Sequence, residues 1–257
     1  MENTENDQND HEKETKNDTP AEANGVEEEE EDELSKEIMA RHFRPSIIKT
    51  EAWEGYMFAG LEIRIKESTD LYGAMLWPSA MVLCHFLDTH REAHNLEDKN
   101  IIELGAGTGL VTIVTSLLGA KVTSTDLPEI LGNLQYNVNR NTRGRCRHPP
   151  LVTELSWGKD LEKRFPRASC HFDYIMAADV VYAHPFLNEL METFEHLCQD
   201  NTVILWAMRF RLDPENSFVG RFQKLFHLEE LYNLPGLKIK LYSATRRCPR
   251  SQHLDTT

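Results

Sequence analysis

A glycine-rich segment carries the clearest chemical signal in this sequence. Gly105, Gly107 and Gly109 alternate with Ala106 and Thr108, directly after a short apolar run and before a longer one. Glycines let the backbone turn sharply and approach a ligand closely, and ligands of open α/β sheets bind at the carboxyl ends of the strands. The segment therefore predicts a ligand site of the nucleotide-binding type.

The spacing of these glycines argues against two common phosphate sites. A phosphate-binding P-loop ends in Gly-Lys-Ser/Thr, whereas Gly109 is followed by Leu110 and Val111. A dinucleotide-binding GxGxxG motif would need its third glycine at position 110, which is leucine. The loop instead has the form E-x-G-x-G-x-G.

Two carboxylates flank the loop and narrow the choice of ligand. Glu103 lies two residues before Gly105, and Asp126 lies 21 residues after it, at the end of the next predicted strand. A carboxylate at the second position can accept the ribose hydroxyls of an adenosine ligand. The charge of Glu103 disfavours a pyrophosphate and suits a cationic group. S-adenosylmethionine, which has an amino group, a sulfonium and no phosphate, fits these residues better than a dinucleotide.

Alternating strands and helices must position these residues. The predicted strands cover residues 100–104, 121–125, 151–155, 172–177, 202–208, 227–232 and 237–243, and the predicted helices cover 79–93, 110–118, 128–140, 185–198 and 217–226. This alternation predicts an α/β fold with a mostly parallel sheet covered on both faces. The last two strands have no helix between them, so they should form an antiparallel hairpin. The alternating run 61–66, after Gly60, predicts a small N-terminal β-hairpin with residues 56–59.

The acidity of the chain belongs to one end. The formal net charge is −14, but residues 1–37 hold 16 acids and 3 bases, and the remaining 220 residues hold 26 acids and 25 bases. Residues 1–37 include seven consecutive acids and almost no apolar side chain, so we expect a disordered acidic tail. Residues 38–246 should form the folded domain, and 247–257 a flexible C-terminal end. The nearly neutral body argues weakly against RNA binding.

Cysteine usage and hydropathy indicate the compartment. The five cysteines are an odd number and contain no CxxC pair, which favours a reducing compartment and predicts no metal framework. The N-terminus lacks the apolar run of a signal peptide, and no stretch approaches the ~20 apolar residues of a membrane span. We expect a soluble intracellular protein, located in the cytoplasm, with the nucleus as a second location to test.

Four segments together resemble a known family. The motif E-L-G-A-G-T-G, with T-D at the next strand end, resembles the seven-β-strand S-adenosylmethionine-dependent methyltransferases, which have a Rossmann-like class I fold with an antiparallel last strand. The segments Tyr72–Pro78, Leu155–Gly158 and Ala178–Tyr182 are similar to those of the protein-lysine methyltransferases of the methyltransferase-like twenty-one group. The resemblance covers residues 45–245 and leaves the acidic tail outside.

The resemblance implies roles for individual residues. It places the methionine part of the cofactor on Gly105, Ala106 and Gly107, and the ribose on Asp126. The adenine would lie beside Trp157, with room given by Gly158. Further contacts would come from Trp77 and the backbone of Ala178, and Glu103 and Gly109 complete the predicted cofactor site. Asp179 and Tyr182 would face the substrate lysine. The implied substrates are abundant cytosolic proteins, such as seventy-kilodalton chaperones, AAA-type ATPases or a translation factor.

The chemistry of methyl transfer is consistent with these roles. The reaction is an in-line displacement, so the enzyme must align the two reacting centres and exclude water. The lysine amine must be neutral to attack, although its ordinary pKa is ~10.4. Asp179 could orient the incoming ammonium group, and Tyr182 could line the channel or hydrogen-bond the nitrogen. No metal is needed for this reaction.

Alternatives remain open for the residues and for the function. Trp77, Trp157 and Tyr182 could simply be core aromatics, and Asp179 could cap a loop or helix. The chain could methylate a small molecule or RNA, or bind the cofactor without catalysis. An Asn/Asp-Pro-Pro-aromatic motif would indicate amide or adenine nitrogen chemistry, but Ala-Asp-Val-Val-Tyr stands in that place.

Overall fold

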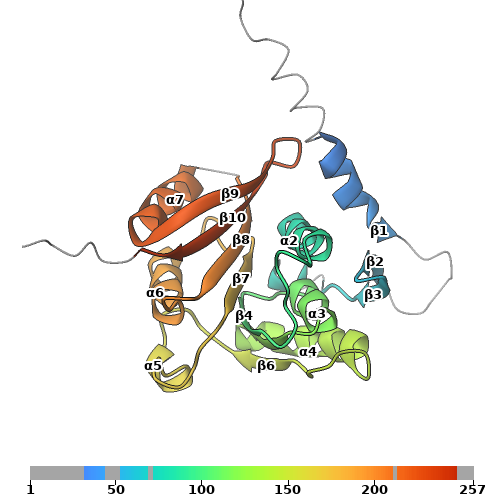
Figure 1. Ribbon diagram of the computed structural model, residues 1–257, viewed down its shortest axis with the longest axis horizontal. Coiled ribbons are helices and arrows are strands. Elements are labelled where there is room, and N and C mark those ends of the chain that lie inside the picture. Colours follow the sequence, from blue (N-terminus) through green and yellow to red (C-terminus); the bar gives the residue numbers. More distant parts are fainter. Residues whose placement is uncertain (1–31, 44–52, 69–71, 211–212, 248–257) are drawn as a thin grey trace, which may run out of the picture.

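A seven-stranded sheet forms the centre of the molecule (Figure 1). The computed structural model describes residues 32–43, 53–68, 72–210 and 213–247. The strands are β4 (Asn100–Leu104), β5 (Lys121–Asp126), β6 (Leu151–Glu154), β7 (Tyr174–Ala178), β8 (Val203–Arg209), β9 (Phe226–Leu234) and β10 (Ile239–Arg246), in the spatial order β6-β5-β4-β7-β8-β10-β9. Strands β4 to β8 pair in parallel, and β10 runs antiparallel to both β8 and β9. The predicted mostly parallel sheet with an antiparallel end is confirmed.

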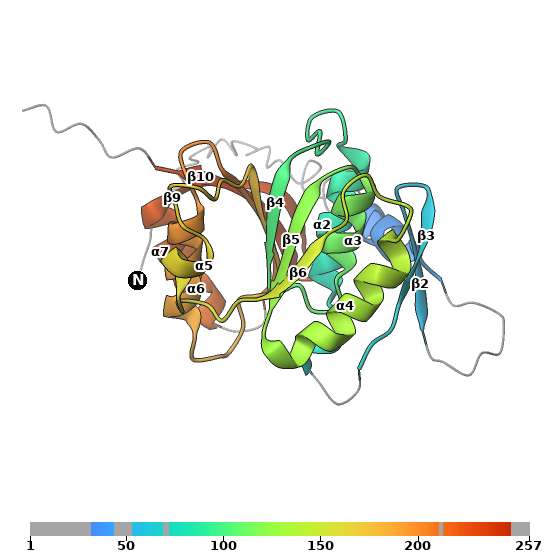
Figure 2. The same cartoon turned by 90° about the horizontal axis from the view of Figure 1, so that it is seen from below.

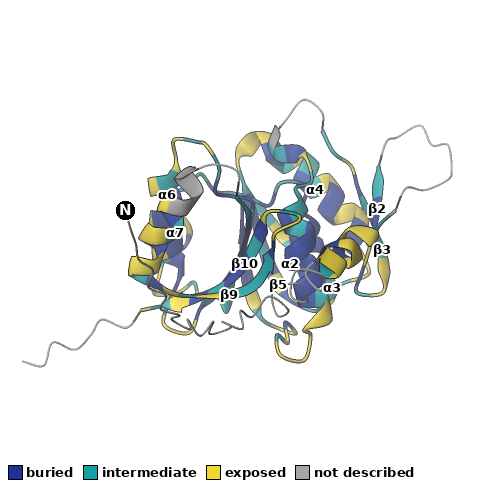
Figure 3. Cartoon of the chain, turned by 90° about the horizontal axis from the view of Figure 1, so that it is seen from above, coloured by how far each residue is buried: buried dark blue, intermediate teal, exposed yellow. Residues whose placement is uncertain are grey.

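Helices cover both faces of this sheet (Figure 2). One face carries α2 (Pro78–Thr89), α3 (Leu110–Leu117) and α4 (Pro128–Thr142), and the other carries α5 (Leu161–Arg164), α6 (Leu187–Leu197) and α7 (Asp213–Leu225). Each face has its own buried apolar cluster. On the second face, Trp206 of β8 packs against Phe194, Phe218 and Phe222. Figure 3 shows the buried residues gathered between the helices and the sheet.

Some predicted boundaries differ from the observed ones. Helix α2 ends at Thr89 rather than at residue 93. Strand β7 begins at Tyr174 rather than at Phe172, and the ring of Phe172 packs edge-on against that of Phe165. The short helix α5 was not expected from the sequence, since its four residues are too few to show a helical apolar period.

A second, three-stranded antiparallel sheet lies outside helix α4 (Figure 2). It consists of β1 (His42–Phe43), β2 (Glu54–Phe58) and β3 (Leu61–Ile65), and the predicted N-terminal hairpin is its β2–β3 pair. Ala59 and Gly60, which form the turn, both have positive φ. Strand β1 was not predicted.

A helix precedes the predicted start of the folded domain. Residues 32–40 form this helix, and its Ser35 and Ile38 are buried, so residues 32–37 of the predicted acidic tail are helical. An ion pair between Arg41 and Asp88 ties the end of this helix to α2. Residues 1–31 and 248–257 lie outside the described residues, and the division into tail, domain and C-terminal end otherwise stays a prediction.

Two observations concern membranes and metals. Among the described helices, none is both long and apolar enough to cross a membrane. In the same part of the chain, no group of three or more His, Cys, Asp and Glu side chains is arranged to hold a metal ion. The four cysteines described are free thiols, and Cys248 lies outside the described residues.

Candidate active site

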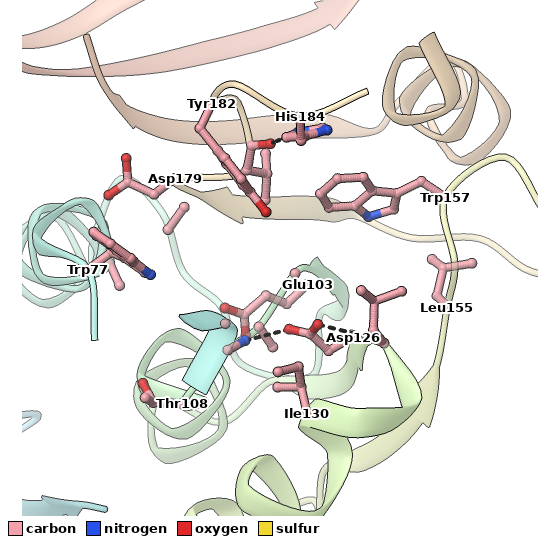
Figure 4. Close-up of a pocket in the computed structure, with 18 of the residues that line it drawn as sticks. Trp77, Glu103, Thr108, Asp126, Ile130, Leu155, Trp157, Asp179, Tyr182 and His184 are labelled. Atoms are coloured by element: carbon pink, nitrogen blue, oxygen red, sulfur yellow. Dashed lines mark hydrogen bonds between the residues drawn. The ribbon is translucent and has the colours of Figure 1, made fainter. Parts of the chain in front are cut away.

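A cavity of about 580 Å³ opens at the carboxyl ends of β4, β5 and β7 (Figure 4). The order of strands reverses between β4 and β7, and ligands of open α/β sheets bind at such a switch point. The 3-10 helix η1 (Tyr72–Ala74), the start of α2 and the loops after β5, β6 and β7 complete the walls. The volume lies in the range of roughly 300 to 1,000 Å³ that small-molecule sites occupy.

The glycine loop adopts a backbone that only small residues allow. Gly105 and Gly107 have φ values of +63° and +56°. A Cβ atom on Gly107 would lie 2.8 Å from the carbonyl oxygen of Gly73, and one on Gly105 would lie 3.0 Å from Val180 Cγ1. The glycine loop is therefore packed between η1 and the loop that follows β7, and it presents backbone without side chains to the cavity.

Asp126 holds this loop in place. Its Oδ2 accepts a hydrogen bond from the Gly107 amide at 2.7 Å, and its Oδ1 accepts one from the Leu127 amide at 2.7 Å (Figure 4). Burial raises the pKa of the Asp126 carboxyl to about 6, although both amide donors favour its charged form. Asp126 thus fixes the loop and also presents a carboxylate to the cavity.

Glu103 is the most deeply buried carboxyl group of the cavity wall. Its side chain accepts a hydrogen bond from Thr112 Oγ1, which in turn lies 2.6 Å from Ser124 Oγ. Burial, and secondly the charge of Asp126, raises the pKa of Glu103 to about 8. The free protein therefore holds a proton on Glu103 near neutral pH, and a cationic ligand would favour its release.

Asp179 connects the wall of the cavity to the start of helix α2. Its Oδ1 accepts a hydrogen bond from the Arg209 amide at 2.9 Å, and its Oδ2 accepts one from the Ser79 amide at 3.4 Å. Asp179 also has a φ of +54°, a left-handed conformation that is uncommon for residues other than glycine and that clusters at functional sites. The capping role and the lysine-facing role are compatible, because the buried carboxylate also lines the cavity.

A histidine that we did not predict organises the aromatic wall. His184 Nε2 lies 3.0 Å from the Val180 carbonyl oxygen, and His184 Nδ1 accepts a hydrogen bond from the Phe186 amide at 3.1 Å. These two partners assign the ring hydrogen to Nε2. The ring stands edge-on to Tyr182 with centroids 4.4 Å apart, and it lies 5.4 Å from the Trp157 ring (Figure 4). Only the position of His184 two residues after the D-x-x-Y motif could have pointed to it.

Ten of the eleven predicted site residues line the cavity. They are Trp77, Glu103, Gly105, Ala106, Gly107, Asp126, Trp157, Ala178, Asp179 and Tyr182. Gly109 is not among the lining residues; it begins helix α3, and a Cβ on it would lie 2.7 Å from Leu134 Cδ1. Gly158 is also not among the lining residues, and a Cβ there would meet Glu189 of α6 at 2.9 Å. Both glycines pack closely against helices, and the functional roles of all the predicted site residues stay predictions.

The electrostatics of the cavity suit a cationic cofactor without phosphate. The acidic side chains that line it are Glu103, Asp126, Glu129 and Asp179, of which Glu103 holds a proton in the free protein, and Lys159 is the one lysine. This excess of acids would repel a pyrophosphate, and it would attract the ammonium and sulfonium groups of S-adenosylmethionine. The glycine loop supplies the open backbone that the cofactor's close approach needs.

The sheet with its reversed β10 and the glycine loop after β4 are those of a class I S-adenosylmethionine-dependent methyltransferase. Solved structures share this fold: the Thermus thermophilus 16S rRNA methyltransferase RsmC, in complex with AdoMet and guanosine, is 16% identical with a TM-score of 0.56, over 79% of this chain and 52% of that chain. A S-adenosylmethionine-dependent methyltransferase from Agrobacterium tumefaciens is 15% identical with a TM-score of 0.51, over 79% of this chain and 72% of that one. Within this class, the model of the lysine methyltransferase family matches residues 58–225, and the chain belongs to that family.

Curated relatives agree with this assignment. The protein-lysine methyltransferase METTL21E of Mus musculus is 63% identical over 84% of this chain and 88% of that protein. The protein N-lysine methyltransferase METTL21A of Mus musculus is 36% identical over 76% and 88%, and the EEF1A lysine methyltransferase 3 of Xenopus tropicalis is 37% identical over 74% and 84%. The resemblance, the enzyme class and the cofactor S-adenosylmethionine that we expected are confirmed.

Proposed function

We propose that this cavity is where a lysine side chain of a protein substrate receives a methyl group from S-adenosylmethionine. The observation that carries the proposal is the placement of Asp179 and Tyr182 on the β7 side of the same cavity that Asp126 and the glycine loop form from the other side (Figure 4). One wall thus suits the cofactor, and the opposite wall would receive the amine.

The cofactor side is built from β4, β5 and the loop after β6. When bound, S-adenosylmethionine supplies an electrophilic methyl group on a positively charged sulfur. The bare backbone of the glycine loop would hold its methionine part, Asp126 its ribose, and Trp157 its adenine. Glu103 would balance the positive charge from beneath the loop, since burial makes its charged form depend on a nearby cation.

The substrate side must deliver a neutral amine. The nitrogen forms its bond to the methyl carbon as the carbon–sulfur bond breaks, so the amine must lose its proton to solvent before it attacks. The aromatic rings of Trp77 and Tyr182 would desolvate the lysine, which lowers the pKa of its amine. The carboxylate of Asp179, fixed by two backbone amides, would draw the ammonium group into position, and the hydroxyl of Tyr182 would align the nitrogen.

The candidate protein substrates of this chain can be ranked for testing. The relative from Xenopus tropicalis is named for lysine methylation of EEF1A, and this supports a translation factor as the first candidate to test. Chaperones and AAA-type ATPases are the next candidates. We further propose that the protein acts in the cytoplasm, which imaging of a tagged full-length chain, including a search for nuclear signal, would test.

A labelling experiment with a charge-neutral variant tests the proposal. The purified chain is incubated with tritiated S-adenosylmethionine and a lysate of cells that lack it, and labelled bands are examined by mass spectrometry for methyl-lysine. Asp179→Asn is the matched control, because asparagine keeps the shape and tolerates left-handed φ. Label in protein bands with the native chain alone supports the proposal. Label that is confined to RNA or small molecules contradicts it.

A further inference from the structure

Three asparagines on one face of helix α4 bind the outer edge of strand β3. Asn133, Asn137 and Asn141 recur every four residues, so they lie along one side of the helix. We call them the asparagine ladder. Each of them donates a side-chain hydrogen bond to a backbone carbonyl, either at Arg64 of β3 or at Lys66, the residue that follows β3. The ladder thereby attaches this sheet to the catalytic domain.

Two members of the ladder make the same pair of bonds to β3. The Asn141 side chain accepts from the Arg64 amide at 2.8 Å and donates to the Arg64 carbonyl at 2.8 Å. The Asn137 side chain accepts from the Lys66 amide at 2.9 Å and donates to the Lys66 carbonyl at 2.9 Å. Both asparagines are buried. The amides therefore replace a neighbouring strand along the open edge of β3.

Each of the two makes a further bond, but only that of Asn137 reaches the cofactor loop. Asn141 Nδ2 also donates to the backbone carbonyl of Asn137 at 2.7 Å, which lies within helix α4. Asn137 Nδ2 also donates to the carbonyl oxygen of Thr108 at 3.0 Å. Thr108 lies between Gly107 and Gly109, and it lines the cavity. Because an amide group has two hydrogens, Nδ2 can serve both carbonyls at once. One buried side chain thus joins the end of β3 to the loop that faces the cofactor.

The chain beyond β3 returns to the same loop. The Ser68 amide donates to the Ala74 carbonyl at 2.9 Å, next to Gly73, whose own carbonyl packs closely against Gly107. The glycine loop is therefore contacted by Asp126 from β5, by Gly73 from η1 and by Asn137 from α4. Two of these three contacts are linked to the end of β3. Gly73 is next to Ala74, which binds Ser68, and Asn137 binds Lys66.

We propose that Asn137 is a positioning residue that couples the N-terminal sheet to the cofactor loop. Loss of its amide frees the Thr108 carbonyl and loosens the loop, which weakens cofactor binding. Because coupling between two sites is reciprocal, cofactor binding at the loop also stabilises the end of β3. Asn141 holds the same strand without touching the loop, so it carries no such coupling.

The matched pair Asn137→Ala and Asn141→Ala tests this. Both variants lose the two bonds to β3, and a similar fall in melting temperature is expected from each. Titration calorimetry with S-adenosylhomocysteine should show about fivefold to tenfold weaker binding for Asn137→Ala, as the loss of one buried hydrogen bond implies. Asn141→Ala should bind within about twofold of the native chain by the same scale. Equal affinities for all three proteins, or an equal loss in both variants, would overturn the proposal.

Hydrogen exchange adds a readout that general destabilisation would not change. In the native chain, S-adenosylhomocysteine should slow exchange of the Arg64 amide, and in Asn137→Ala this protection should vanish although the Asn141 partner remains. Asn137→Asp is the second variant if the alanine variant does not fold, since it keeps the acceptor for the Lys66 amide and loses the donor to the Thr108 and Lys66 carbonyls. Ligand protection of Arg64 that persists in the folded variant would refute the coupling.

Discussion

Replacement of Glu103 by glutamine should remove a pH dependence of stability. In the folded protein, burial raises the pKa of Glu103 from 4.5 to about 8. Between these values the unfolded chain carries a charged Glu103 and the folded chain a protonated one. Folding therefore takes up a proton, and the free energy of unfolding falls as the pH rises. Glutamine has nearly the shape of protonated glutamic acid and does not titrate.

The size of the effect follows from the shift. Each pH unit inside the window costs about 1.4 kcal/mol, so the native chain should lose about 2 kcal/mol between pH 6.5 and pH 8 through this group. For a chain of this size, that is a fall in melting temperature of about 4 to 8 °C. Asp126 has a raised pKa of about 6, so most of its own effect on the free energy of unfolding falls below pH 6.5. The lowered pKa values of His85 and His94 act with the opposite sign, and also below about pH 6.5.

Thermal unfolding of the cofactor-free proteins at pH 6.5, 7.25 and 8 measures this. The native chain should lose stability across the series relative to Glu103→Gln. S-adenosylmethionine should flatten the difference and bind more tightly as the pH rises, because its positive charge favours the charged carboxylate. S-adenosylhomocysteine, which lacks the sulfonium charge, should show a smaller rise. Parallel pH profiles for the two proteins would refute the assignment of a protonated Glu103.

Four further outcomes are expected. Asp126→Ala should weaken S-adenosylmethionine binding by about tenfold to a hundredfold in calorimetry, since it removes a buried charged acceptor that also holds the Gly107 amide; unchanged affinity would contradict its role. Asp179→Asn should abolish methyl transfer to a substrate found by labelling and keep cofactor affinity within about twofold; retained transfer would rule out the lysine-facing role. Gly109→Ala should lower the free energy of unfolding by about 2 to 4 kcal/mol, from backbone strain and contact with Leu134; a neutral effect in denaturant titration would speak against that packing. Removal of residues 1–31 should leave the melting temperature unchanged, whereas removal of residues 1–40 should lower it because Ile38 is buried; equal melting curves for both truncations would contradict this.

The glycine loop and its carboxylates were predictable because their signal is local. Glycines after an apolar strand, with an acid at the next strand end, require no knowledge of the rest of the chain. Parallel strands then bring Gly107 and Asp126 to one edge of the sheet, where the structure places them 2.7 Å apart from nitrogen to oxygen. The antiparallel end was equally readable, since no helix separates the last two strands.

Other features depend on contacts between distant segments. Gly158 packs against Glu189, which lies 31 positions further along the chain. The asparagine ladder joins α4 to the end of a strand, through partners that lie 67 to 77 residues earlier. Polar side chains at such positions are usually solvated on a helix surface, so their sequence period gave no sign of a partner.

The sequence by itself determined the strand ends at which the site forms and a fitting cofactor, because backbone conformation and apolar periodicity are encoded in neighbouring residues. The class of the enzyme followed from the resemblance of its motifs to a known family. The tertiary structure alone decided which carboxyl group is protonated, which glycines pack closely against helices, and how the N-terminal sheet is joined to the cofactor loop. Charge states and hydrogen-bond partners depend on burial, and burial is a property of segments that meet only in the folded chain.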